Sequence, residues 1–131
     1  MQPLEIEITA EPLSAEGGGW DSRFGAEICF FGVVRGTEDG APIEGIEYSV
    51  YGAMAPRVLQ QIGSRAHQQF GEHQAKIIHR IGFVAAAEPS LLLRVGAPHS
   101  AEAFEICRWY LAELKREAPF WKHIVKSPVI A

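Results

Sequence analysis

Three residues near the end of the chain have types and spacings that suit the binding of an anion. His99 stands at the expected start of a helix, Lys115 near the end of that helix, and Lys122 just beyond Pro119. A helix rises about 1.5 Å per residue, so His99 and Lys115 lie at its opposite ends. Proline cannot continue a helix, so the chain turns at Pro119 and Lys122 can return beside Lys115. Two adjacent lysines walled by aromatic residues would suit an anionic substrate.

Each of these residues also has an ordinary structural explanation. The helix dipole favours a lysine near a helix C-terminus, and Lys122 can extend over the surface beside Trp121. Arg35 follows an apolar strand, where a solvated arginine is common. His99 after Pro98 could simply cap the helix. Ser100 is first of all an N-cap, although a helix N-terminus also offers free N–H groups to an anion. The residues alone therefore leave two interpretations open: an anion pocket and an ordinary solvated surface.

Hydrophobic patterns predict the elements that would position these residues. Alternation and apolar runs predict strands, and apolar residues at helical spacing predict helices. In the second helix, the expected buried stripe is Phe104, Cys107, Leu111 and Leu114. Strands are predicted over 4–9, 26–35, 43–51, 75–84, 90–97 and after Pro119, and helices over 54–70 and from Ser100 onward.

The predicted order is β-β-β-α-β-β-α-β, which belongs to the α+β fold class. We find no repeats and no linker, so a single domain over residues 1–131 is expected. The strands over 26–35 and 43–51 are expected to form a hairpin with a mobile loop over 36–42, since that loop contains Gly, Asp and Pro.

Composition excludes several classes of protein. The net charge of −4 disfavours a protein that coats nucleic acid, although a local basic pocket remains compatible with it. The two cysteines, Cys29 and Cys107, are both expected in the core, without a disulfide. No apolar run approaches the roughly 20 residues needed to span a bilayer, and the acidic first residues do not form a signal peptide. A cytoplasmic protein without membrane contact is expected.

The sequence contains no motif for a cofactor or a metal. It lacks G-x-G-x-x-G, a phosphate-binding loop, H-E-x-x-H and C-x-x-C, and its five histidines do not show the spacing of metal ligands. His79 lies in a predicted strand before Arg80, where a structural hydrogen bond is the favoured role. We therefore expect no cofactor and no metal.

Four segments together resemble the large, catalytic subunit of molybdopterin synthase. They are GAEICFFGVVRG, IEYSVYGAMA, IIHRIG and PHSAEAFEICRWYLAELKREAPFWK, which span roughly residues 25 to 122 in the order of that family. The resemblance implies an α/β-hammerhead-type domain with an additional α+β part. It also implies sulfur transfer from the C-terminal Gly-Gly thiocarboxylate of a small ubiquitin-like sulfur carrier to cyclic pyranopterin monophosphate. The large subunit is expected to be a homodimer with one small subunit at each end.

The resemblance also implies the residues of the site. The lysines would neutralise phosphate and the oxyanion at the thiocarboxylate carbonyl, and one of them could move a proton. Phe30 and Trp121 would exclude water. The implied catalytic residues are Lys115 and Lys122, and the implied substrate-binding residues are Phe30, Arg35, His99, Ser100 and Leu111.

Two departures from the family pattern keep alternatives open. The family has His-Arg where this chain has His99-Ser100, and the family continues well beyond the second lysine with a tail that carries a cation. Lys126 is the candidate to replace that cation. A non-catalytic relative that binds the sulfur carrier or a pterin is therefore the second hypothesis. A small-molecule anion-binding domain, independent of the resemblance, is the third.

Overall fold

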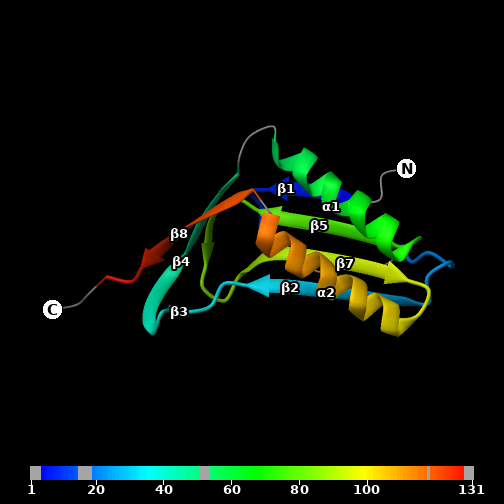
Figure 1. Ribbon diagram of the computed structural model, residues 1–131. Coiled ribbons are helices and arrows are strands. Elements are labelled where there is room, and N and C mark those ends of the chain that lie inside the picture. The colour runs from blue at the N-terminus through cyan, green and yellow to red at the C-terminus, as the bar shows by residue number, and fades with distance from the viewer. Residues whose placement is uncertain (1–3, 15–18, 51–53, 118, 129–131) are drawn as a thin grey trace.

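The computed structural model describes residues 4–14, 19–50, 54–117 and 119–128. Within these ranges the chain forms two sheets and two helices, and both helices lie on one face of the first sheet (Figure 1). The elements in chain order are β1 (Glu5–Thr9), β2 (Ala26–Val33), β3 (Thr37–Glu38), β4 (Ala41–Val50), α1 (Met54–Phe70), β5 (Gln74–Arg80), β6 (Gly82–Ala85), β7 (Pro89–Ala97), α2 (Ser100–Glu117) and β8 (Phe120–Lys126).

The first sheet has the strand order β1-β5-β7-β2, with β1 parallel to β5 and the other pairs antiparallel. Alternate side chains of a strand point to opposite faces. Ile77 and Leu93 therefore face the helices and are fully buried, together with Ile62 of α1 and Tyr110 of α2. The opposite face carries charged side chains from all four strands. The helices thus build the main core on one side. The other side is polar around the charged residues but also holds the buried side chains of Ile78 and Leu92.

The second sheet is centred on β4, which pairs with β6 on one side and with β8 on the other, and also with β3. The α+β class is confirmed, but the predicted strand over 75–84 is two strands. After Arg80 the N–H of Ile81 donates to the carbonyl of Thr9 at 2.8 Å, and Gly82 adopts φ +88°. The chain leaves the first sheet there and enters the second. A second hydrophobic cluster at this sheet consists of Val34, which follows β2, and of Ile43, Ile46, Tyr48 and Val84.

The predicted hairpin between the strands over 26–35 and 43–51 is wrong. β2 pairs with β7, for example Phe30 opposite Leu93, and β4 lies in the other sheet. The segment 36–42 instead contains a tight hairpin between β3 and β4. Its two central residues, Asp39 and Gly40, have φ of 51° and 78°, as a two-residue turn that matches strand twist requires.

Two predicted core positions are exposed. Ile28 and Phe30 of β2 face the helices, so Cys29 between them faces the other way and is exposed, whereas Cys107 is buried as predicted. Phe104 is 63% exposed because it lies beside the buried stripe of α2 and not within it. That stripe consists of Ala103, Ile106, Cys107, Tyr110 and Leu114.

The predicted end of α1 is confirmed. Gly71 adopts φ +78°, and its N–H donates to the carbonyl of His67 at 2.9 Å, which closes the last turn. Neither α1 nor α2, as far as the structure describes them, is both long and apolar enough to cross a membrane.

Candidate functional site

The two predicted catalytic lysines lie on either side of the turn at Pro119. Lys115 belongs to the last turn of α2 and Lys122 is the third residue of β8, and both side chains are exposed. The buried side chains of Leu114 and Pro119 anchor the turn between them. Figure 1 shows β8 leaving the end of α2 where the two sheets meet. That the two ammonium groups share one pocket stays a prediction.

A partly buried histidine of the first sheet packs beside Lys122. The His79 ring stacks on Phe120, with centroids 3.8 Å apart and planes 10° apart, and meets the edge of Tyr48 at 5.1 Å. Tyr48 is the cross-strand neighbour of Lys122. Nδ1 of His79 lies 2.8 Å from the carbonyl oxygen of Arg80. A carbonyl only accepts, so Nδ1 carries the proton.

Burial keeps the His79 ring uncharged at neutral pH. Desolvation, together with the charge of Lys122, lowers its pKa to about 4, against the opposing effect of the hydrogen bond to Arg80. The predicted structural hydrogen bond of His79 is confirmed. Its position beside Lys122 could not be predicted, because it depends on the pairing of β8 with β4, two segments far apart in the sequence.

Arg35 offers a cation close to the junction of the sheets. It follows β2, and its side chain is 76% exposed, with Nη2 3.3 Å from Oε2 of Glu38. An exposed ion pair of this kind is worth little, so an incoming anion can compete with Glu38 for the guanidinium. Phe30 of β2 and Leu111 of α2 are partly buried and pack against the main core. They contribute apolar packing and no charge, and neither lines either of the two cavities described below.

His99 and Ser100 lie at the other end of α2. The carbonyl of His99 accepts the first helical hydrogen bond, from the N–H of Ala103 at 3.1 Å. The helix begins at Ser100 as predicted. Its N-cap position is therefore occupied by His99, and the prediction that Ser100 is the cap is wrong. From His99 to Lys115 the helix axis advances about 24 Å. Within one chain, these two side chains cannot contact the same phosphate group.

A shallow hollow lies beside Lys122, on the face of the second sheet that carries Glu47, Ser49, Trp121 and His123. The side chain of Lys122 alternates to the other face, next to Tyr48. The volume of the hollow is about 500 Å³, and it is lined by residues of β4 and β8. Trp121, which was expected to exclude water, is exposed at this surface. The hollow opens on the solvent side of the second sheet, so a partner would have to cover it to make the site dry. Its lining residues are Glu47, Ser49, Phe120, Trp121, Lys122 and His123.

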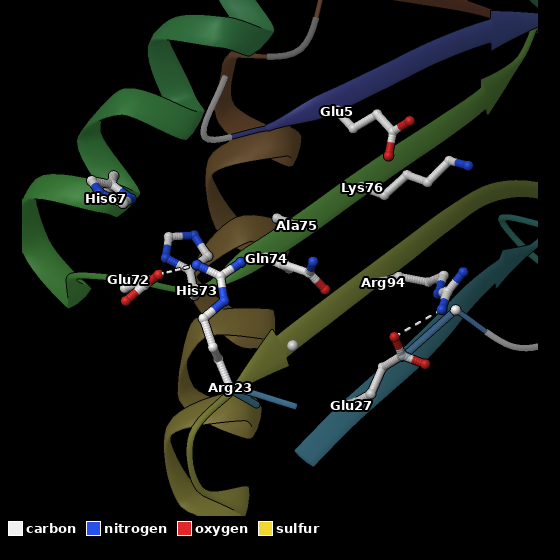
Figure 2. Close-up of a pocket in the computed structure, with 12 residues that line it drawn as sticks. Glu5, Arg23, Glu27, His67, Glu72, His73, Gln74, Ala75, Lys76 and Arg94 are labelled. Carbon is white, nitrogen blue, oxygen red and sulfur yellow. Dashed lines mark hydrogen bonds and ion pairs between the residues drawn. The ribbon is translucent and has the colours of Figure 1, made fainter. Parts of the chain in front are cut away.

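A larger cavity of about 650 Å³ lies elsewhere, on the polar face of the first sheet (Figure 2). Its arginines are already paired: Arg94 with Glu27 at 2.8 Å, and Arg23 with Glu72. An anion would have to displace those carboxylates. None of the site residues predicted from the sequence lines this cavity. Because its arginines are paired with carboxylates, these charged residues favour a structural role. Among the described residues, no group of three or more His, Cys, Asp or Glu side chains could hold a metal ion.

The sequence of this chain is similar to those of known proteins. Residues 2–117 match the family described as "MoaE protein". A molybdopterin synthase catalytic subunit from a Nostoc species is 39% identical over 119 residues, covering 88% of this chain and 72% of the relative.

Solved structures agree with the fold. The crystal structure of molybdopterin synthase from Staphylococcus aureus superposes with a TM-score of 0.85 at 29% identity, covering 98% of this chain and 95% of that one. A complex of subunits 1 and 2 of molybdopterin-converting factor from Helicobacter pylori gives a TM-score of 0.68 at 22% identity, covering 95% and 85% of the two chains. The second likeness supports the fold alone.

Proposed function

The chain belongs to the MoaE protein family, and we propose that it is the sulfur-transferring, catalytic subunit of a molybdopterin synthase. In this reaction two sulfurs pass from C-terminal thiocarboxylates of a small carrier to cyclic pyranopterin monophosphate and form a dithiolene. The observation that carries the proposal is the extent of the match, since the family covers residues 2–117 and the Staphylococcus aureus structure covers 98% of the chain. The phosphate of the substrate and the thiocarboxylate of the carrier tail are both anionic, in agreement with the exposed cations at the sheet junction.

The proposed roles follow from the chemistry of each side chain. The thiocarboxylate sulfur attacks a side-chain carbon of the substrate and displaces its oxygen substituent, which gives a thioester with the carrier. Water then attacks the thioester carbonyl, the carbonyl–sulfur bond breaks, the sulfur stays on the substrate and the carrier leaves as a carboxylate. Negative charge develops on the carbonyl oxygen during this attack, and a positioned ammonium stabilises that charge more than it stabilises the ground state. Lys115 and Lys122 take this role. Arg35 has a planar guanidinium that fits a phosphate with two hydrogen bonds. The carrier tail would cover the exposed hollow at Lys122 and exclude water from it.

The position of His99 supports a site made by two chains. If His99 and Lys115 contact one substrate phosphate, they must come from different copies, because about 24 Å of helix separates them within one chain. We propose a homodimer in which the His99 end of one α2 approaches the Lys115 end of the other. One carrier would bind at each of the two equivalent sites, giving a heterotetramer.

Mixed dimers test this arrangement. His99→Ala and Lys115→Ala homodimers should both be poorly active, whereas mixing the two variants should restore activity in the dimers that contain one intact site. If subunits exchange and activity does not return, the two residues do not act across the interface.

Reconstituted turnover tests the function itself. The chain, a thiocarboxylated carrier and cyclic pyranopterin monophosphate are combined, and the dithiolene product is measured. Lys115→Ala and Lys122→Ala should each lower turnover about 100-fold or more, as loss of an oriented charge from a site typically does. Arg116→Ala is the matched control, since Arg116 is an exposed cation in the same helical turn, paired with Glu113. Normal rates in both lysine variants would refute the assigned roles.

A non-catalytic relative that binds the carrier remains the second candidate, and Ser100 favours it because the family has a cation at this position. It predicts carrier binding without product in the same assay. The main proposal also includes a cytoplasmic location, which fractionation of cells expressing the tagged chain would test.

A further inference from the structure

A nearly buried arginine at the junction of the sheets has no role in the proposed chemistry. The Arg80 side chain is only 12% exposed, and its Nε and Nη1 are buried without a hydrogen-bond partner among the described residues. Nη1 lies 3.6 Å from Oε1 of Glu88, which is an ion-pair distance but too long for a hydrogen bond. A buried charge that is incompletely satisfied is costly, so its retention calls for an explanation.

Glu88 connects this charge to the end of β2. Its carboxylate accepts the N–H of Ala85 at 3.1 Å, and its own N–H donates to the carbonyl of Ala85 at 3.0 Å. Its carbonyl accepts the N–H of Val34 at 3.0 Å, while the N–H of Ala87 donates to the carbonyl of Val34 at 2.7 Å. The turn between β6 and β7 therefore holds both backbone groups of Val34.

Val34 immediately precedes Arg35. On the other side, the carbonyl of Gly36 accepts the N–H of Ile43 at 2.9 Å. The backbone of Arg35 is thus fixed from both neighbours, although its side chain is exposed. The direction in which the guanidinium can extend depends on the turn that carries Glu88.

We propose that Arg80 is a positioning residue for Arg35: its charge holds Glu88 in the turn, the turn holds Val34, and Val34 sets the starting point of the Arg35 side chain. The inference rests on the proposed function in one respect, namely that Arg35 binds the phosphate of the substrate. Arg80 itself does not contact that phosphate.

The experiment measures the Kd of each variant for cyclic pyranopterin monophosphate, together with turnover and thermal stability. Arg80→Met should raise Kd about 3- to 10-fold, as couplings of this indirect kind usually do. Arg80→Lys, which keeps the charge, should restore part of the loss. The decisive comparison is Arg35→Ala against Arg35→Ala/Arg80→Met, where the Arg80 substitution should have no further effect on Kd.

A matched control separates positioning from stability. Arg94 is also a mostly buried arginine of the first sheet, 16% exposed and paired with Glu27, but it lines the large cavity, to which the turn that carries Glu88 contributes no described residue. Arg94→Met should lower thermal stability and leave Kd unchanged. Glu88→Gln is the second variant in case Arg80→Met does not fold. Glu88→Gln should raise Kd as well. It should also lower thermal stability more than Arg80→Met does, because it leaves the buried charge of Arg80 unpaired. Arg80→Met instead leaves Glu88 unpaired, and that side chain is 45% exposed.

Each outcome either supports or overturns the positioning role of Arg80. An effect of Arg80→Met on Kd that persists in the Arg35→Ala background, or an unchanged Kd in both Arg80→Met and Glu88→Gln, would overturn the positioning role. If Arg35→Ala leaves Kd unchanged, Arg35 does not bind the phosphate and the inference fails with it. Absence of turnover with normal substrate binding would refute the catalytic proposal alone.

Discussion

The hydroxyl oxygen of Tyr110 lies 2.7 Å from Nε2 of His73, and both side chains are buried. Nδ1 of His73 lies 2.8 Å from the carbonyl oxygen of Gly71, so Nδ1 carries the proton and Nε2 accepts the tyrosine hydroxyl. This contact joins the C-terminal end of α1, capped by Gly71, to the middle of α2. It satisfies every polar atom of the imidazole ring without a charge.

We predict that Tyr110→Phe lowers the free energy of unfolding by about 1–3 kcal/mol, because it leaves a buried acceptor on His73 without a donor. The double variant His73→Phe/Tyr110→Phe should be less destabilised than the sum of the two single variants, since it removes both polar partners. Denaturant titration of all four proteins measures this difference. Strictly additive effects would mean that the hydrogen bond does not couple the two residues.

The sequence predicted the local elements well and the pairing of distant elements poorly. The apolar spacing of α1 and the glycine that follows it at position 71 were sufficient to place that helix. The break between β5 and β6 escaped prediction because the apolar pattern continues through Ile81, while its cause is a hydrogen bond to Thr9, more than seventy residues earlier.

The pairing of distant elements also limited the prediction of the candidate site. Helical rise already separated His99 from Lys115, and the structure agrees. The stacking of His79 on Phe120 depends on which strands pair, and local patterns do not encode that. The Asp39-Gly40 turn, by contrast, carries a strong local signal that the broader loop assignment overlooked.

Acid should destabilise the fold between pH about 6.5 and pH about 4. Burial lowers the pKa of His79 to about 4 and also lowers the pKa of His73, relative to an ordinary value of 6.5. In that window the unfolded chain binds protons that the folded chain does not, so stability falls as pH falls.

His79→Phe tests this dependence because phenylalanine can keep the stack on Phe120. Thermal unfolding measured from pH 7.5 to pH 4.5 should show a smaller pH dependence in the variant, with a residual part from His73. An identical pH dependence in wild type and variant would show that His79 is not held uncharged by the fold.

Gly63 lies in α1 where that helix crosses β1. A Cβ added there would lie 2.5 Å from Cβ of Leu4, which is fully buried. In an exposed helix the change from glycine to alanine gains about 1 kcal/mol. Here the overlap should dominate, so Gly63→Ala should destabilise by about 1–3 kcal/mol. Ser64→Ala, at the exposed neighbouring position, is the control and should be close to neutral. A more stable Gly63→Ala protein would show that β1 can move away from α1.

Ser100→Arg restores a cation at the start of α2, where the family carries one. Because His99 occupies the N-cap position, this substitution does not remove a cap, contrary to the expectation from the sequence. A cation in the first turn opposes the helix dipole, so stability should fall by about 0.3–1 kcal/mol.

Binding of cyclic pyranopterin monophosphate by Ser100→Arg should tighten roughly tenfold at low salt if the arginine adds one charge-assisted hydrogen bond to the phosphate. The gain should shrink at high salt, because an exposed ion pair is screened. Ser100→Gln, which is long and uncharged, is the control and should not tighten binding. Binding by Ser100→Arg that is equal to or weaker than that of wild type would show that the phosphate does not lie at this end of α2, and would favour the non-catalytic carrier-binding function.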